Sequence, residues 1–464
     1  MDTYLTNKQY KYGFHDKVKP YYILRPGLSK KTVEEISHLK NELAWMRQSR
    51  LLGYDFFVKR PLPDWGPSLR GLNFSKLRYY ATPLDKAAAE SGYIPSNVKK
   101  TFERLGIPSV EVDFLTGSGA QYDSEMVYHA LKKDWQGRGV IFCSMDEAVK
   151  KHPDIVSKYY GTIVTANDNK LAALNTAVWS GGSFVYIPRN VKLDKPLQTY
   201  FRLNARNLGQ FERTLIIAEE GSEVHYVEGC TAPVYNVDSL HAAVVEIIVK
   251  PYARVRYTTV QNWSNNVYNL VTKRAFVAEG GVMEWIDGNF GSQLTMKYPS
   301  AILAGRGAKA EIMSLAVAGP GQQQDAGSKA IHLASDTSSN ILSKSIAHHG
   351  GRTSYRGLIK VAPGAKNCKI KVKCDALLTD NKSQSDTYPT MDIKNSRTQT
   401  EHEATVTRVG EEQLFYLQSR GLSESEATSM IVSGFIEPIA RELPQEFAIE
   451  LNRLINLEMD GSVG

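Results

Sequence analysis

Two stretches in the C-terminal third of the sequence hold residue types that bind metals. Cys374 lies in "KVKCDALLTD", and the acidic stretch "TEHEATV" follows further along the chain. Thiolate, imidazole and carboxylate groups together form a ligand set for iron or zinc. On a strand, Glu401 and Glu403 would share one face and His402 would take the other. The spacing alone leaves two interpretations open, a metal site and ordinary solvated side chains.

The residues around Cys374 predict which way its thiol points. Cys374 alternates with Val372 and Ile370, while lysines occupy the positions between them. Because successive side chains of a strand point to opposite faces, Cys374 is expected to face the interior. Cys368 has the same parity, but Cys-x5-Cys is not a zinc spacing and no second cysteine pair accompanies it. Taken alone, this pattern favours a buried cysteine over a structural zinc ligand.

Cys230 is a second candidate, in the stretch "YVEGCTAP". The glycine before it and Pro233 after it predict a corner at the end of a strand, where a thiol would be accessible. A nucleophilic cysteine needs nearby cations that stabilise the thiolate. The alternative is a buried cysteine that acts as a small hydrophobic residue.

Composition limits the classes of protein. With 464 residues the chain is longer than one ordinary core, which favours two or three domains or one elongated repeat domain. Four scattered cysteines and the absence of an apolar leader favour a reducing compartment, and no apolar run is long enough to span a membrane. The net charge of +7 comes from lysines interspersed with acids, so we expect no nucleic-acid partner.

Residues 1–174 are predicted to form a mainly helical region. One helix is expected over "SKKTVEEISHLKNELAWMRQSRLL", because Ser29 is a good N-cap and apolar residues recur at helical spacing up to Met46. A second helix is expected from Ser96 to Leu105. The stretch between them, "KRPLPDWGPSLRG", is rich in proline and glycine and predicts an extended loop.

Residues 175–408 show a repeated pattern of an apolar strand, a small-residue turn and an alternating strand. The turns contain Gly221, Ala253, Gly280, Gly307 and Gly364, which are 32, 27, 27 and 57 residues apart, and "AIHLASDTSSNIL" supplies a rung in the longest gap. Units of this length without a helix do not match leucine-rich or ankyrin repeats, and propeller blades need more strands per unit. We therefore predict a mainly β fold with a right-handed parallel β-helix core.

Residues 409–464 are predicted to return to helices. "GEEQLFYLQSRG" would end at Gly421, Ser423 and Glu426 have the spacing of a capping box, and "LPQEFAIELNRLINLEMD" would form a third helix. A solenoid needs its exposed core covered, so covering the solenoid and docking a partner are both open roles for this region.

Several longer motifs occur in an order that resembles the SufB family of iron-sulfur cluster assembly scaffolds. They include "KYGF", "GVIFCSMDEAVKKHPDIVSKY", "GQFERTLIIAEEGSEVHYVEGCTAP", "LHAAVVEIIV", "SYRGLIKVAP", "EHEATVTRVGEEQLFYLQSRG" and "ELPQEFAIELNRL", which span nearly the whole chain. The resemblance implies a right-handed parallel β-helix whose C-terminal helices dock the SufC ATPase. It also implies SufD as the paired subunit, a cysteine desulfurase with a SufE-type sulfur carrier, and downstream carriers that receive the cluster.

The resemblance also implies roles for individual residues. Cys230 matches the sulfur acceptor, while Cys374 and Glu403 match metal-binding positions of the cluster assembly site, with Glu401 and His402 as neighbouring cofactor-binding candidates. The residues that match a route for sulfur between the two cysteines are Arg202, Asn204, Gln261, Trp263 and Lys273. The implied cofactor is a transient iron-sulfur cluster, and binding of a flavin by the assembled complex stays open. Because no Walker loop is present, ATP hydrolysis would belong to SufC and this chain would be a scaffold rather than an enzyme.

The sequence departs from the family pattern at a few places. It reads "KCDALLTDN" where the family has a sequence close to "QCDSMLIGD", and it lacks an N-terminal cysteine cluster that some members carry. Two alternatives are kept: a SufD-like subunit without a sulfur acceptor, which the two cysteine motifs disfavour, and a β-helix polysaccharide-cleaving enzyme, for which the rungs show no stacked carboxylates. The resemblance fits a plastid protein of the chloroplast stroma or a bacterial cytoplasmic protein, and we expect the former.

Overall fold

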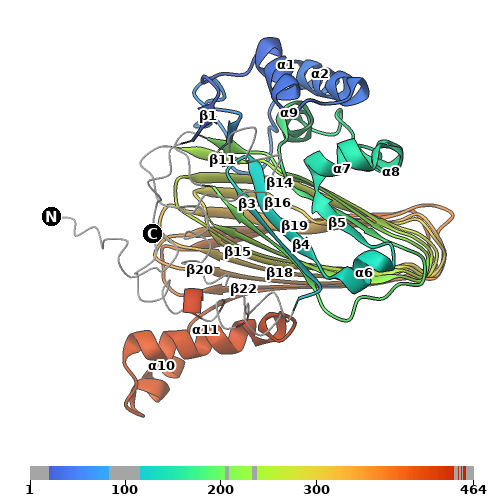
Figure 1. Cartoon of the computed structure of the whole chain (residues 1–464). Helices are drawn as coiled ribbons and strands as arrows, with labels where there is room; N and C mark the ends of the chain where they lie inside the picture. Colours follow the sequence, from blue (N-terminus) through green and yellow to red (C-terminus); the bar gives the residue numbers. More distant parts are fainter. Residues whose placement is uncertain are drawn as a thin grey trace.

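A computed structural model describes residues 20–82, 115–203, 208–231, 238–443, 448, 451 and 453–455. The centre of the molecule is a parallel β-solenoid between residues 184 and 408, with helices in the N-terminal and C-terminal regions (Figure 1). The predicted β-helix core with helical flanks is confirmed. Residue 175, where the core was predicted to begin, lies inside a helix, and the earliest described strand with a parallel partner begins at Gly117.

Each turn of the solenoid places one strand in the first of two sheets and one or two strands in the second. The first sheet has ten strands: β3 (Gly117–Tyr122), β4 (Glu125–Leu131), β7 (Leu197–Arg202), β10 (Glu223–Thr231), β13 (Arg254–Trp263), β15 (Val282–Gly291), β18 (Lys309–Ala318), β20 (Ser338–Ala347), β22 (Cys368–Leu378) and β24 (Thr398–Arg408). The second sheet has twelve: β5 (Ile141–Ser144), β6 (Ser183–Ile187), β8 (Gly209–Gln210), β9 (Arg213–Ala218), β11 (Ser239–His241), β12 (Val244–Val249), β14 (Val267–Val277), β16 (Leu294–Lys297), β17 (Ser300–Leu303), β19 (Gln323–His332), β21 (Arg352–Val361) and β23 (Gln384–Ile393).

The strands within each sheet pair in parallel, except at the N-terminal end. There β4 pairs antiparallel with β3, and β5 pairs antiparallel with β6. A separate two-stranded antiparallel sheet joins β1 (Tyr22–Ile23) to β2 (Ala81–Thr82). At the opposite end, β23 and β24 are the last strands of their sheets among the described residues.

The turns between the two sheets lie where the repeat pattern places them. Gly221, Gly280 and Gly307 have positive φ values of 69°, 59° and 71°, a backbone conformation that favours glycine. Ala253 lies in the turn between β12 and β13, and Gly364 lies in the turn between β21 and β22. The sequence repeat therefore corresponds to the turns of the solenoid.

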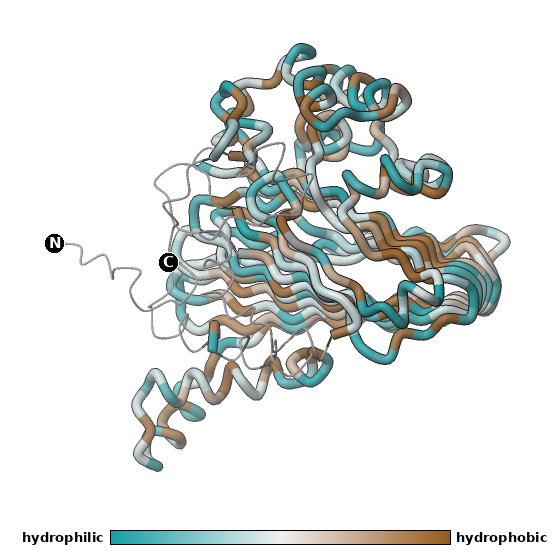
Figure 2. Tube along the Cα trace, viewed as in Figure 1, coloured by the Kyte–Doolittle hydropathy of each residue, from teal (hydrophilic) through white to brown (hydrophobic). Residues whose placement is uncertain are grey.

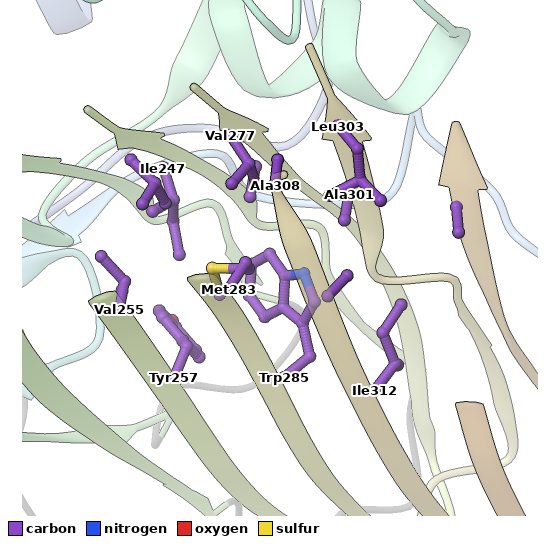
Figure 3. Close-up of a cluster of buried hydrophobic side chains, with 14 of the residues drawn as sticks. Ile247, Val255, Tyr257, Val277, Met283, Trp285, Ala301, Leu303, Ala308 and Ile312 are labelled. Atoms are coloured by element: carbon purple, nitrogen blue, oxygen red, sulfur yellow. The ribbon is translucent and has the colours of Figure 1, made fainter. Parts of the chain in front are cut away.

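The main hydrophobic core fills the lumen between the two sheets. Figure 3 shows Val255, Tyr257, Met283, Trp285 and Ile312 of the first sheet opposite Ile247, Val277, Ala301 and Leu303 of the second. Parallel in-register pairing stacks residues of the same kind over one another, and Figure 2 shows these apolar stripes along successive turns. Burial of each large apolar side chain contributes about 1.5–3 kcal/mol, so the stacked stripes are the main source of stability.

Most of the N-terminal helices cover the outer face of the second sheet, whereas Trp135 of the short helix α6 packs against the core of the lumen. Their bounds are α1 (Lys30–Leu39), α2 (Ala44–Lys59), α6 (Lys133–Gly137), α7 (Met145–Lys151), α8 (Pro153–Tyr159) and α9 (Lys170–Val178). Apolar residues of α1, α2 and α9 pack with outward-facing residues such as Tyr268, Leu270 and Leu294. The predicted helix from Ser96 to Leu105 lies outside the described residues.

The single helix predicted after Ser29 is wrong, because the chain forms α1 and α2 with a break between them. Ser29 caps α1 as predicted, since its side chain accepts a hydrogen bond from the backbone N–H of Thr32. The helix ends because Asn41 adopts a left-handed conformation with φ of 49°. Leu39 and Leu43, which extend the apolar period in the sequence, are each 41% exposed.

The C-terminal helices α10 (Glu411–Gln418) and α11 (Glu424–Ala440) form as predicted. The reciprocal capping box of Ser423 and Glu426 is present at the start of α11. Val432, Ile436 and other apolar residues of α11 pack on the outer face of the first sheet. Of the predicted third helix, residues 448, 451 and 453–455 are described and are helical. In the part of the chain that is described, no helix has the length and apolarity needed to cross a bilayer.

Candidate functional site

The thiol of Cys230 lies inside the lumen, near the end of β10. The prediction of an accessible corner is wrong, because only 1% of the residue is exposed. Cys230 has the inward parity of Tyr226 and Glu228, and β10 continues past it to Thr231. Its Sγ donates a hydrogen bond to Glu228 Oε1 at 3.5 Å, and Nε2 of Gln261 lies 3.9 Å from the sulfur.

The electrostatic surroundings keep Cys230 protonated. Burial raises the pKa of the Cys230 thiol well above its usual value, and the carboxylates of Glu228 and Glu212 raise it further. The ammonium groups of Lys273 and Lys297 act in the opposite direction. Cations are therefore close enough to favour a thiolate, as a nucleophilic cysteine requires, but in the resting protein burial and the carboxylates outweigh them.

Two buried lysines and one aspartate form an ionic cluster beside Gln261. Nζ of Lys273 lies 3.1 Å, and Nζ of Lys297 3.3 Å, from Oδ1 of Asp287. Lys273 also donates to Thr259 Oγ1 at 2.5 Å, and Lys297 donates to Gln261 Oε1 at 3.1 Å. Burial lowers the pKa of Lys297 to about 8, although Asp287 opposes this shift. Burial disfavours ionisation of Asp287, but the two lysines outweigh it and hold the pKa of its carboxyl below the usual value.

Trp263 reaches the same network through His241. The centroids of the two rings are 4.6 Å apart. His241 lies between Glu212 and Asn269, with each of its ring nitrogens 2.7 Å from an oxygen of one of them. Asn269 in turn donates to Gln261 Oε1 at 2.9 Å. A continuous chain of buried hydrogen bonds therefore links Glu212 to Gln261, next to Cys230.

The structure thus brings together most of the route residues that the resemblance implied. Gln261, Lys273 and Trp263 converge near Cys230 inside the lumen. Arg202 is fully buried at the end of β7, in register with Thr231, the residue after Cys230. Asn204 lies outside the described residues.

A column of polar residues runs along the lumen from Glu228 to Cys374. Strand pairing places them in register on successive turns, and all of them are buried: Glu228, Thr259, Asp287, Ser314, Ser343 and Cys374. Five strand spacings of about 4.8 Å separate its ends, a span of roughly 24 Å. Oγ of Ser314 donates to Oγ of Ser343 at 3.1 Å.

Glu228, Asp287 and Lys297 were not predicted from the sequence as parts of this site, nor were the two serines of the column. In the sequence they are polar positions of alternating strands, which usually face solvent. Aligning the rungs on their turns and following the inward parity would have placed Glu228, Asp287 and the serines in the column. The position of Lys297 depends on how the second sheet folds over the first.

Cys374 lies in the lumen as its alternation predicted, with 5% of the residue exposed. Burial raises the pKa of its thiol to about 12, although a hydrogen bond with Tyr355 lowers it in part. The hydroxyl oxygen of Tyr355 also lies 2.9 Å from Oγ of Ser328. Cys374 is therefore a protonated thiol between hydroxyl groups in this chain.

The acidic stretch lies on β24, at the open edge of the first sheet. Glu401 pairs with Lys371, His402 with Val372 and Glu403 with Lys373, as alternation predicted for their faces. Nζ of Lys373 lies 3.4 Å from Oε2 of Glu403. The carboxylates of Glu401 and Glu403 are thus on the face opposite to Cys374, which pairs with Ala404.

Within the single chain these candidate ligands do not converge. No group of three or more His, Cys, Asp or Glu side chains among the described residues is arranged to hold a metal ion. His402 shares the inward parity of Cys374, because it pairs with Val372, two residues before Cys374. The chain thus presents a thiol, an imidazole and two carboxylates near one edge, without closing a site around them.

The fold is that of a parallel β-solenoid protein with buried thiols and ionic groups in its lumen. Residues 201–435 match the family model described as "SUF system FeS cluster assembly, SufBD core domain", and residues 94–199 match "SufBD protein N-terminal region". Iron-sulfur cluster assembly SufBD family proteins of Staphylococcus aureus strain USA300 and Staphylococcus haemolyticus strain JCSC1435 are each 55% identical to this chain over 455 residues, which is 98% of this chain and 98% of theirs.

This chain belongs to the SufBD family. It is therefore a component of the SUF system for iron-sulfur cluster assembly, and its work involves a transient iron-sulfur cluster and other SUF proteins. The family contains both kinds of solenoid subunit, so membership does not decide between SufB and SufD.

Proposed function

We propose that this chain is the SufB-type scaffold subunit, which accepts persulfide sulfur at Cys230 and assembles a nascent cluster at Cys374. The observation that carries this proposal is that both thiols face one lumen, at the two ends of a buried column of polar residues. A SufD-like subunit without its own sulfur acceptor remains the alternative. The presence of Cys230 among ionic groups that can act on sulfur favours the SufB type.

The lumen has the chemistry that a sulfur route needs. A persulfide is anionic near neutral pH, and buried ammonium groups stabilise an anion strongly where water is excluded. Lys273 and Lys297 supply these charges, and Gln261 can donate a hydrogen bond to sulfur. Trp263 lies on the same strand as Gln261, while Arg202 lies on the neighbouring strand β7 with the parity opposite to Cys230. Asn204 enters the proposal through the family resemblance alone. Sulfur would then pass along the column toward Cys374.

The open edge formed by β23 and β24 is the proposed assembly end. Cys374 lies one strand inside this edge, and Glu401, His402 and Glu403 lie on the edge strand itself. An edge strand offers unpaired backbone N–H and C=O groups to another chain. We propose that SufD pairs there and that its approach brings Cys374 and Glu403 together as metal ligands, with His402 and Glu401 beside them.

Exposed aromatic residues on α10 are the proposed contact for the SufC ATPase. Phe415 is 72% exposed and Tyr416 is 57% exposed, and Met430 on the neighbouring helix α11 is also exposed. Large apolar side chains that gather on a surface mark a site for a protein partner. ATP hydrolysis belongs to that partner in this proposal, a cysteine desulfurase with its SufE-type carrier supplies the sulfur, and a downstream carrier takes the cluster.

The expectations about the cellular compartment and about a flavin both change. Both relatives named above are from bacteria, which favours a bacterial cytoplasm over the chloroplast stroma as the compartment. Binding of a flavin is left out of the proposal, because none of the site residues argues for it.

The test is anaerobic reconstitution of the complex with SufC and SufD, followed by visible absorption, for the wild type, Cys230→Ser and Cys374→Ser. One arm receives iron and sulfide directly, and the other receives iron and sulfur from a cysteine desulfurase with its carrier. We expect Cys374→Ser to fail in both arms and Cys230→Ser to fail only with the desulfurase.

The comparison of the two arms distinguishes a cluster ligand, which is needed in both, from a sulfur relay, which is needed only with the desulfurase. If both variants form a cluster as well as the wild type in both arms, the scaffold mechanism is wrong and the SufD-like alternative stands. Cys143→Ser is the matched control, because Cys143 is a buried cysteine outside the lumen, and it should behave as the wild type in both arms.

A further inference from the structure

The burial of Cys230 raises a chemical question that the family resemblance does not answer. Sulfur acceptance requires a thiolate, since the thiolate is the nucleophile in exchange at a sulfur–sulfur bond. Cys230 is a fully buried thiol, and burial raises the pKa of this thiol well above its usual value. With only 1% of the residue exposed, a group inside the lumen is better placed than bulk water to remove the proton.

Glu228 is placed to accept that proton. It lies two residues before Cys230 on the same face of β10, and its Oε1 accepts the hydrogen bond from Sγ at 3.5 Å. Its other oxygen, Oε2, accepts a hydrogen bond from the hydroxyl of Tyr257 on β13. Tyr257 thus fixes the carboxylate so that one oxygen faces the sulfur.

The other polar groups near the sulfur cannot take this role. Gln261 presents an amide Nε2 toward Cys230, and an amide nitrogen donates but does not accept a proton. Nζ of Lys273 and Nζ of Lys297 are directed to Oδ1 of Asp287, at 3.1 and 3.3 Å, whereas the thiol donates its hydrogen bond to Glu228; the two lysines are placed to stabilise a thiolate or a persulfide. Glu212 is directed to His241, at 2.7 Å.

We propose that Glu228 is the catalytic base of sulfur acceptance at Cys230. The inference rests on the proposed function and adds a residue to it. Glu228 takes the proton from Sγ of Cys230, and the resulting thiolate attacks the terminal sulfur of a donor persulfide, R–S–SH. A new S–S bond forms at Cys230, and the donor's S–S bond breaks with its electron pair moving to the sulfur of R.

The step balances without an added oxidant. The leaving R–S⁻ takes the proton back from Glu228, so the products are Cys230–S–SH and R–SH, and the transferred sulfur keeps its oxidation state. In the resting protein the same carboxylate disfavours a thiolate by charge repulsion. Glu228 therefore suppresses stray reactions of Cys230 and permits the proton transfer only when a donor is at hand to complete it.

The experiment compares two rates in the full-length protein under anaerobic conditions. The first is loading of Cys230 by glutathione persulfide, read by mass spectrometry after blocking with an alkylating agent. The second is direct alkylation of Cys230 by iodoacetamide, measured from pH 6.5 to 9.5. The variants are Glu228→Gln and the matched control Glu223→Gln, which is on the same strand with the opposite parity.

The proposal and a purely electrostatic role predict opposite results. Loss of the negative charge at Glu228 should make Cys230 ionise more readily, so iodoacetamide should react faster with Glu228→Gln than with the wild type. If Glu228 is the base, sulfur loading of Glu228→Gln should nonetheless fall, by about 10²- to 10⁴-fold, the usual contribution of a general base. Loading as fast as in the wild type, or faster in proportion to alkylation, would overturn the proposal. Glu223→Gln should change neither rate.

Two further outcomes, no sulfur uptake by the wild type and failure of Glu228→Gln to fold, also have a defined interpretation. If wild-type Cys230 takes up no sulfur from the donor, and Cys230→Ser behaves identically, the proposed function fails rather than this inference. If Glu228→Gln does not fold, as judged by circular dichroism, Glu228→Asp carries the test because it keeps the charge but moves the carboxylate away from the sulfur. Slower loading with an unchanged alkylation rate supports the base, and unchanged loading overturns it.

Discussion

Cys374 and Glu403 lie on neighbouring strands at the open end of the solenoid but point to opposite faces. Cys374 on β22 is in register with Ala404, while Glu403 on β24 is in register with Lys373. A slip of β24 by one residue would place Glu403 opposite Cys374 and turn its side chain to the lumen. The two proposed ligands can therefore meet through a one-residue change in the register of the edge strand, which would also turn the other side chains of β24 to the opposite faces and which a pairing partner could stabilise.

This arrangement predicts that Glu403→Gln reduces cluster formation but leaves the stability of the folded chain nearly unchanged. Glu403 is 62% exposed and its ion pair with Lys373 is at the surface, so the pair contributes only about 0–1 kcal/mol to folding. We expect the urea midpoint to stay near that of the wild type while cluster formation in the reconstituted complex falls strongly. The matched control is Asp392→Asn on β23, which removes a similar exposed pair with Lys394. A normal cluster yield from Glu403→Gln would exclude this carboxylate as a ligand.

The second prediction concerns the reactivity of Cys374. Burial raises the pKa of this thiol to about 12 from 9.0, which lowers its thiolate fraction roughly 10³-fold at pH 8. Iodoacetamide labelling, followed by mass spectrometry, should be slow in the native protein and fast in urea. Tyr355→Phe removes a hydrogen bond that lowers the thiol pKa, so native labelling should become slower still. Tyr388→Phe, at an exposed tyrosine on β23, is the control, and faster labelling of Tyr355→Phe would contradict the assignment.

The third prediction is a loss of stability in acid that comes from buried histidines. Burial lowers the pKa of His332 to about 4 from 6.5, and its ring nitrogens contact Thr337 and Ser339. Between these pH values the unfolded chain binds the proton that the folded chain excludes, so folding weakens as the pH falls from 6.5 to 4. The shift corresponds to about 3 kcal/mol at most.

Urea unfolding of His332→Gln between pH 4 and 7 measures this contribution. The variant should be less stable at pH 7 but should lose less stability on acidification than the wild type. Burial also lowers the pKa of His225 to about 4, so His225→Gln should reduce the pH dependence independently. An unchanged pH dependence in both variants would show that these rings are not buried in neutral form.

The fourth prediction addresses the docking of the ATPase. Phe415→Ser should weaken SufC binding by tenfold or more, since aromatic anchors at the centre of an interface contribute about 2 kcal/mol or more each. Because Phe415 is exposed, the melting temperature of the isolated chain should stay the same. Titration calorimetry with SufC measures the affinity, and Val58→Ser, at an exposed apolar residue of α2, is the control. Equal affinity for both variants would move the docking site away from α10.

The repeat of the solenoid was predictable because its turns and its alternation are local features. A positive φ at Gly221 or Gly280 favours glycine at that step of the chain, so the glycines mark the turns. The alternation of Cys374 with Val372 and Ile370 likewise determines the face of the strand. These signals need no knowledge of the neighbouring turns.

The features that were mispredicted depend on contacts between distant parts of the chain. The break between α1 and α2 interrupts an apolar period that continues in the sequence. The nearby Lys40 is buried against Glu125 and Asp146, at 3.3 and 2.9 Å. The burial of Cys230 results from the strands stacked on either side of it, β7 and β13. The burial of ionic residues such as Lys297 cannot be predicted from the local sequence, because charged residues usually lie at the surface.

The parallel stacking of the turns also relates the order of synthesis to the order in which the parts of the solenoid can fold. Each turn pairs with the one before and the one after it, so each can add to the preceding turn as the chain leaves the ribosome. The lumen around Cys230 is closed by early turns, and β24, which flanks Cys374, is synthesised last of the solenoid strands. Synthesis thus completes the part of the lumen that holds Cys230 before the end that holds Cys374.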